Sequence, residues 1–305
     1  MDVKQKASLF AIISALILAG SKFSVGLFSG SMAVASSGLD SLLDVFMSAM
    51  NFLAIKKATQ PPDRTHHYGH GKVESLAATA QSVVIVCTGG FIIFKAVQKY
   101  FGQEGIAYSG LDLGVMVLSL IFSFMISTTL RKVGRKTDSN TLKADALHYT
   151  SDLYSNSAAI VAIILTYYTG KVFFDLLFAV IIGFIIIFSA VKILKGGILG
   201  LMDTHIPEPI EKNLIEILNK LPYPYAGFHK LRTRFSGNMK YLDFHLFLCR
   251  KFTVAQAHEQ TDKIELEIKN KIPASDILIH MEPCPYPCEL TEVTCIIVNK
   301  VRMNP

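Results

Sequence analysis

Charged residues are scarce in this chain of 305 residues, because Asp, Glu, Lys and Arg together make up only 18% of it. A soluble domain usually carries about 25%. The hydrophobic fraction is 51% and the mean hydropathy is +0.40. That is more apolar surface than two soluble domains of this total length need for their cores. The composition therefore argues against an ordinary soluble protein and indicates a membrane protein.

Three further absences exclude other classes of protein. Five cysteines are few for the length and odd in number, which argues against a secreted disulfide scaffold. The net charge is +6, but no basic run is interleaved with aromatic residues, so we expect no nucleic-acid partner. Neither a His-Glu-x-x-His nor a Gly-x-Ser-x-Gly motif occurs, which argues against two common hydrolase types.

Long apolar segments dominate the first two thirds of the chain. A helix needs roughly 20 apolar residues to cross a bilayer. Six segments reach that length: 7–28, 32–56, 73–100, 110–131, 142–168 and 172–195. The first is longer than the apolar core of a signal peptide, about 7–15 residues, and it contains Lys22, so we interpret it as a transmembrane helix. The composition changes near 202–207, and we place a domain boundary there.

The distribution of Lys and Arg predicts the orientation in the membrane. Most basic residues of the termini and loops fall on one side of the six segments, and the opposite side receives mainly Lys99 and Lys171. Because positive residues favour the cytoplasmic side, we expect both termini in the cytoplasm, where thiols stay reduced.

The remainder of the chain has the pattern of a small α+β domain with the order α-β-β-α-β. Amphipathic spacing after a proline predicts a helix over 207–221. Alternating apolar residues predict strands over 228–235 and 241–248 around a Ser-Gly-Asn turn. A helix over 253–270 and a strand over 277–280 follow, and 293–298 is a weaker candidate for a further strand. The predicted fold class is thus an all-α six-helix transmembrane domain plus a cytoplasmic α+β, ferredoxin-like C-terminal domain.

Ionisable residues inside two of the apolar segments form the strongest functional signal. Asp40 and Asp44 lie four residues apart in the second segment, and His148 and Asp152 have the same spacing in the fifth. That spacing puts each pair on one helix face. Carboxylates at bilayer depth are costly and mark functional sites. Three carboxylates and one imidazole suit Zn²⁺ and are acceptable to Fe²⁺, Cd²⁺ or Mn²⁺. The alternative is that these groups only hydrogen-bond helices together.

These two pairs, the six segments and the polar tail resemble the cation diffusion facilitator family of divalent-metal/proton antiporters, in particular its bacterial zinc and ferrous-iron efflux members. The resemblance covers nearly the whole chain and implies a transport site at the two pairs. It implies a transport domain over 1–202 and a metal-binding dimerisation domain over 203–305. In this family an Asp in place of His148 is typical of manganese members, so His148 weighs against manganese.

The resemblance also implies metal ligands outside the membrane. In the loop after the second segment these are Asp63, His66 and His70, while we expect His67 to be solvated. In the tail the implied ligands of a binuclear site are His229, His245, His258, His280 and Glu282, with Glu282 where the family has Asp. Lys72 and Asp203 match positions that pair across the dimer. Cys284 and Cys288 depart from the family pattern, and we interpret them as a strap of reduced thiols or, alternatively, as soft metal ligands.

Taken together, the sequence predicts a secondary active transporter, not an enzyme. Zn²⁺, with Fe²⁺ and Cd²⁺ as possible substrates, would be exported in exchange for protons. The protein would be a homodimer that spans the lipid of a bacterial inner membrane several times. Two alternatives are a membrane-anchored metal sensor and an intramembrane metallo-hydrolase. The second fits poorly, because catalytic zinc usually keeps one position open for water.

Overall fold

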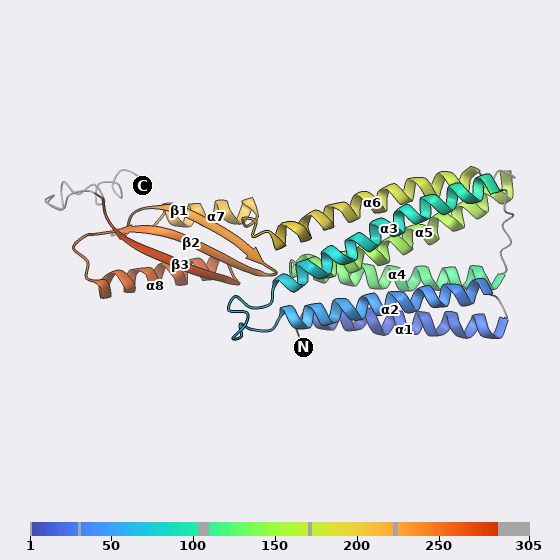
Figure 1. Ribbon diagram of the computed structural model, residues 1–305, viewed down its shortest axis with the longest axis horizontal. Helices are drawn as coiled ribbons and strands as arrows, with labels where there is room; N and C mark the ends of the chain where they lie inside the picture. Colours follow the sequence, from blue (N-terminus) through green and yellow to red (C-terminus); the bar gives the residue numbers. More distant parts are fainter. Residues whose placement is uncertain (1, 30–31, 103–109, 170–172, 222–224, 286–305) are drawn as a thin grey trace. The chain divides into compact units, whose positions relative to one another are not determined.

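The computed structural model describes residues 2–29, 32–102, 110–169, 173–221 and 225–285, and within some helix segments only the backbone. The chain divides into two compact units, Met1–Leu201 and Met202–Pro305. The first contains helices and the second contains both helices and strands (Figure 1). Each unit is described by itself below.

Six long helices form the first unit. They are α1 (Val3–Ser29), α2 (Met32–Ala58), α3 (Lys72–Gly102), α4 (Gly110–Lys136), α5 (Asn140–Thr169) and α6 (Phe173–Leu201). The helices α1 and α2, α4 and α5, and α3 and α6 are the most extensive neighbours, and α5 also lies against α6 (Figure 1). Each predicted segment corresponds to one helix. Most of these helices extend several residues beyond their apolar runs, because charged residues at a helix end do not interrupt its backbone hydrogen bonds.

Four described stretches are long and apolar enough to cross a membrane: Val3–Val25, Lys72–Gln98, Val117–Lys136 and Leu176–Leu201. By that measure of the described residues, α2 and α5 are not among them. These two helices carry the Asp and His pairs noted in the sequence.

The second unit is a three-stranded sheet with two helices. Its elements are α7 (Glu208–Asn219), β1 (Tyr225–Ser236), β2 (Met239–Leu248), α8 (Val254–Lys271) and β3 (Ser275–Pro283). The strand order is β1-β2-β3, with β1 and β2 antiparallel and β2 and β3 parallel. The predicted α-β-β-α-β order and fold class are confirmed, while the weaker candidate strand at 293–298 lies outside the described residues.

One core holds this unit together and leaves the polar positions of the strands accessible. Along β2, Leu242, Phe244, Leu246 and Leu248 are buried, and Asp243 and His245, which alternate with them, are only half-buried. The buried side chains pack with apolar residues of α7 and α8. A capping box, in which Thr253 and Gln256 bond reciprocally, defines the start of α8. The period of two in β2 therefore determines which residues face the helices and which are available to bind ligands.

Candidate metal centres

The first cluster lies between α2 and α5, inside the first unit. His148 Nε2 lies 2.9 Å from Asp44 Oδ1, and Asp152 lies one turn further along α5. One ligand atom from each of Asp44, His148 and Asp152 falls within 4.8 Å of the other two. All three residues are half-buried. The predicted fourth ligand, Asp40, lies one turn before Asp44 on α2, but its side chain is outside the described residues.

These side chains have suitable chemistry for a divalent cation. Two atoms that each lie about 2 Å from a tetrahedral zinc ion lie about 3.3 Å apart. The 2.9 Å between Asp44 and His148 is slightly shorter than that, and no separation among the three ligand atoms exceeds 4.8 Å. An imidazole nitrogen with carboxylate oxygens is a donor set that suits zinc and its neighbours in the first transition row. Helix α2 thus supplies Asp44, and helix α5 supplies His148 and Asp152, to one group of predicted ligands.

The second cluster is in the loop between α2 and α3. Asp63 Oδ1 accepts hydrogen bonds from the backbone nitrogen of Thr65 at 2.8 Å, from Thr65 Oγ1 at 2.8 Å and from the backbone nitrogen of His66 at 2.7 Å. These bonds, that of the Thr65 hydroxyl first, hold the pKa of the Asp63 carboxyl well below its usual range. Asp63 is therefore ionised at neutral pH and needs no proton loss before it binds a cation.

His70 completes the loop cluster from a buried position. Its Nε2 lies 3.2 Å from Asp63 Oδ2, close enough for an ion pair but not aligned as a hydrogen bond. Neither ring nitrogen has a hydrogen-bond partner among the described residues, although the residue is only 5% exposed. The ring centroids of His66 and His70 lie 4.4 Å apart. A buried imidazole without a partner is costly, and a metal ion at this position would satisfy it. His67 is exposed, in line with its expected solvation.

The third cluster lies on the sheet of the second unit, where three strands bring histidines into register. His229 pairs with His245, and His245 pairs with His280. The carboxylate of Glu282, at the end of β3, contacts two of these histidines. Its Oε2 lies 2.9 Å from His229 Nε2 and its Oε1 lies 2.6 Å from His245 Nδ1. These contacts, that with His245 first, lower the pKa of the Glu282 carboxyl. The longer glutamate therefore reaches two imidazoles at once.

Two of the predicted tail ligands, His280 and His258, lie further from the carboxylate of Glu282 or outside the cluster. His280 Nε2 lies 3.9 Å from Glu282 Oε1. His258 is exposed on α8, where its Nε2 lies 3.6 Å from Asp262 Oδ2, and it is not part of the described cluster. The reason is the face of the helix: Thr261, Ile264 and Ile268 point into the core, so His258 faces solvent. The sequence reasoning grouped His258 with the other histidines, and in this chain the structure does not bring it to them.

Other polar residues outside the three clusters form ion pairs or hydrogen bonds within their own unit. On the sheet, Arg232 Nη2 lies 3.6 Å from Asp243 Oδ2, and Arg234 Nη1 lies 3.2 Å from Asp203 Oδ1. Lys72 Nζ donates to the backbone oxygen of Leu201 at 3.3 Å. Cys284 is a buried free thiol whose backbone nitrogen donates to the Leu248 oxygen at 2.7 Å, and Cys288 lies outside the described residues.

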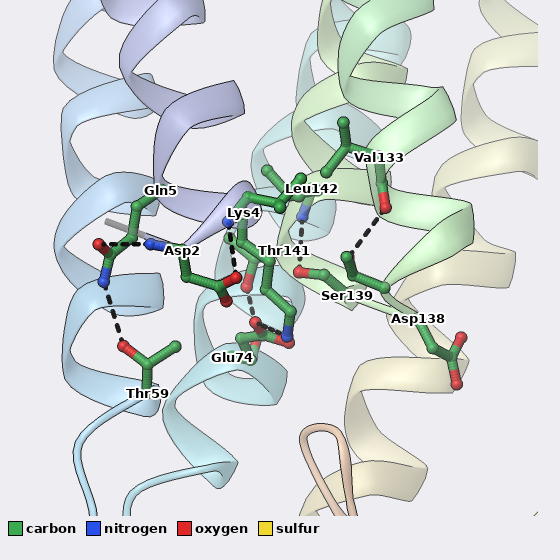
Figure 2. A network of polar contacts seen from close by, with 12 residues as sticks. Asp2, Lys4, Gln5, Thr59, Glu74, Val133, Asp138, Ser139, Thr141 and Leu142 are labelled. Atoms are coloured by element: carbon green, nitrogen blue, oxygen red, sulfur yellow. Dashed lines mark hydrogen bonds and ion pairs between the residues drawn. The ribbon is translucent and has the colours of Figure 1, made fainter. Parts of the chain in front are cut away.

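A buried ion pair that the sequence reasoning missed lies where the loop meets α3. Figure 2 shows Lys4 of α1 and Thr141 of α5 converging on Glu74 near the start of α3. Lys4 Nζ lies 2.8 Å from Glu74 Oε1, and their side chains are only 8% and 3% exposed. Thr141 Oγ1 donates to the Glu74 backbone oxygen at 2.9 Å. We call this end of the unit, where α2 ends and α3 begins, the loop end.

Comparison with known proteins shows to which protein family this chain belongs. Residues 8–202 match the cation efflux transmembrane domain, and residues 206–284 match the cytoplasmic domain of cation efflux proteins. The chain therefore belongs to the cation efflux family, whose members are membrane transporters, and the predicted family resemblance is confirmed. The chain is also 36% identical over 274 residues, 90% of each chain, to the cation-efflux pump FieF of Salmonella newport (strain SL254) and equally to that of Salmonella heidelberg (strain SL476).

Proposed function

We propose that this protein exports Zn²⁺, or a chemically similar divalent cation such as Fe²⁺ or Cd²⁺, in exchange for protons. The observation that carries the proposal is the cluster of Asp44, His148 and Asp152 between two membrane helices. The relatives named as cation-efflux pumps support the outward direction of transport. The imidazole of His148 favours zinc over manganese, because nitrogen ligands suit zinc while oxygen ligands alone suit manganese.

Exchange for protons follows from the chemistry of these ligands. A metal ion binds deprotonated carboxylates and neutral imidazole, so its binding releases protons and its departure allows them to return. With Asp40 as a fourth ligand, the centre would be saturated by protein groups. That arrangement suits binding and release of an ion, whereas hydrolysis needs a position for water. We therefore propose secondary active transport, driven by the proton gradient.

The rest of the molecule is assigned accordingly. Residues 1–202 form the transport domain, with both termini in the cytoplasm of a bacterial inner membrane, as the distribution of Lys and Arg indicates. Residues 203–305 form a cytoplasmic domain that binds metal at His229, His245 and Glu282 and joins two copies into a homodimer. The loop residues Asp63, His66 and His70 bind a further metal ion next to the start of α3.

The test is flux in proteoliposomes under an imposed pH gradient, with Zn²⁺, Fe²⁺, Cd²⁺ and Mn²⁺ compared. We expect zinc flux that depends on the gradient and is lost in Asp44→Ala and in His148→Ala. Tyr154→Phe on α5 is the matched control and should transport as the wild type does, since Tyr154 is exposed and outside the cluster. Undiminished flux in His148→Ala would refute the assignment. Metal binding without any flux would instead favour the metal sensor.

A further inference from the structure

Next to the transport centre lies a carboxylate that none of the three metal clusters contains. Asp145 is on α5, three residues before His148 and therefore one turn closer to the loop end. The residue is 0% exposed. Side chains from α2 and α3 surround it, so that three helices meet at this one carboxylate.

The hydrogen bonds of Asp145 come from neutral groups and reach only one of its two oxygens. Gln81 Nε2 donates to Asp145 Oδ1 at 3.2 Å, and Ser48 Oγ donates to the same oxygen at 3.4 Å. Asn51 Nδ2 donates to Gln81 Oε1 at 3.0 Å and so orients the Gln81 amide. Asp145 Oδ2 is buried and has no hydrogen-bond partner among the described residues.

Three charged side chains of this unit have other partners. Lys4 pairs with Glu74 of α3 (Figure 2), Arg131 of α4 donates to Thr150 at 2.9 Å, and His148 contacts Asp44 of α2. No Lys or Arg is within ion-pair distance of Asp145 in the described part of the chain. His148 and Tyr149 of α5 interact electrostatically with Asp145, and both also interact with Asp44 of α2 and Asp152 of α5.

A carboxylate in this position is not expected to stay ionised beside an empty centre. Burying a charge without a counter-charge is costly, and such a group takes up a proton instead. A divalent ion bound at His148 changes this balance. Side chains three residues apart on a helix are neighbours, with about 5–6 Å between their Cβ atoms. A divalent ion held next to His148 adds positive charge close to Asp145, of which the Asp44 and Asp152 carboxylates offset a part, and this charge favours the ionised form of Asp145.

We propose that Asp145 is a proton-binding site coupled to metal occupancy of the transport centre. When a divalent cation binds at Asp44, His148 and Asp152, the carboxylic acid of Asp145 loses its proton to solvent and becomes a carboxylate. When the cation leaves, the carboxylate takes up one proton again. The proposal rests on the proposed function, which it deepens by assigning a coupling proton to a residue that does not itself bind the metal. The alternative is that Asp145 only holds three helices together.

The two roles are separated by Asp145→Asn, which keeps an oxygen acceptor for Gln81 and Ser48 but carries no titratable proton. Full-length protein in detergent is titrated with Zn²⁺ in weak buffer, and proton release is measured with a pH indicator. We expect Asp145→Asn to bind Zn²⁺ at the centre and to release fewer protons than the wild type, by up to about one per protomer. Asp138→Asn, at an exposed carboxylate, should release as many as the wild type.

Equal proton release by Asp145→Asn and the wild type would overturn the proposal. If the wild type binds no metal that depends on His148, the proposed function fails instead, so the two failures are distinguishable. Infrared difference spectra of the wild type provide a second measurement if Asp145→Asn does not fold. The band of a protonated carboxyl should disappear on addition of Zn²⁺, and it should move in frequency in Asp145→Glu. A band that does not move would belong to another carboxyl and would also overturn the proposal.

Discussion

At the residue scale, neighbouring side chains set the ionisation of the carboxylates in two of the candidate metal centres. At Asp63 the surrounding donors lower the pKa of the carboxyl, and at Glu282 two histidines have the same effect. A carboxyl whose pKa is lowered stays ionised above that pKa and loses its charge only as the pH falls through it. In these two centres the carboxylate can therefore bind a metal ion without first losing a proton.

The hydroxyl of Thr65 gives a prediction at this scale. It donates to Asp63 Oδ1 and fixes the carboxylate that faces His66 and His70. Thr65→Val should weaken zinc binding by the loop by about tenfold, the lower end of the range for groups that orient metal ligands, because Thr65 is exposed. Thr65→Ser keeps the hydroxyl and should bind as the wild type does. Calorimetry in a His148→Ala, His245→Ala background isolates the loop, and equal affinities of the Val and Ser variants would contradict this role.

At the scale of elements, α3 and α6 approach each other closely through glycines. A Cβ added at Gly89 would lie 2.8 Å from Ile187 Cγ1 and 3.3 Å from the Gly183 oxygen, whereas a Cβ at the adjacent Gly90 would meet nothing within 4 Å. Small residues allow membrane helices to pack at such short range. The two neighbouring glycines thus have different roles, although composition and hydropathy do not distinguish them.

We therefore predict opposite effects of the same substitution at adjacent positions. Gly89→Ala should destabilise the first unit by about 1–3 kcal/mol, because the added methyl group overpacks the α3–α6 contact. Gly90→Ala should be neutral or stabilising by up to about 1 kcal/mol, because alanine is the better helix former. Thermal unfolding in detergent measures both. A Gly89→Ala variant as stable as Gly90→Ala would show that α3 and α6 are not packed as described.

At the scale of the whole molecule, the contact of Lys4 with Glu74 connects the first helix to the start of the third. Because both side chains are buried, the loss of one partner leaves the other charge uncompensated. Thr141 adds α5 to the same point through the Glu74 backbone. The loop centre, whose buried His70 precedes Glu74 by four residues, is thereby linked to the helix that carries His148.

Glu74→Gln should accordingly lower the stability of the first unit by about 3 kcal/mol, the usual cost of breaking a buried pair. Asp138→Asn, which removes a more exposed partner of Lys143, should cost less than about 1 kcal/mol. The measurement is the unfolding midpoint in detergent at neutral pH. A Glu74→Gln variant no less stable than Asp138→Asn would mean that the buried pair does not stabilise the fold.

The sequence by itself determined the local features of this protein. Six apolar runs predicted six helices, a period of two predicted the buried face of β2, and four-residue spacing put His148 and Asp152 on one face of α5. Such features depend on neighbours within about one helical turn or a few strand positions, so periodicity reveals them. Family resemblance then singled out the loop and tail ligands, most of which lie together.

Only the tertiary structure decided which side chains meet from different elements. It placed Asp44 against His148, brought Glu282 to His229 and His245, left His258 in solvent, and surrounded Asp145 with Gln81 and Ser48. Asp145 was visible in the sequence as a carboxylate within an apolar segment, but nothing local showed that no Lys or Arg of the described residues pairs with it. Contacts between helices depend on their rotation and depth relative to one another, and these follow from packing over the whole unit.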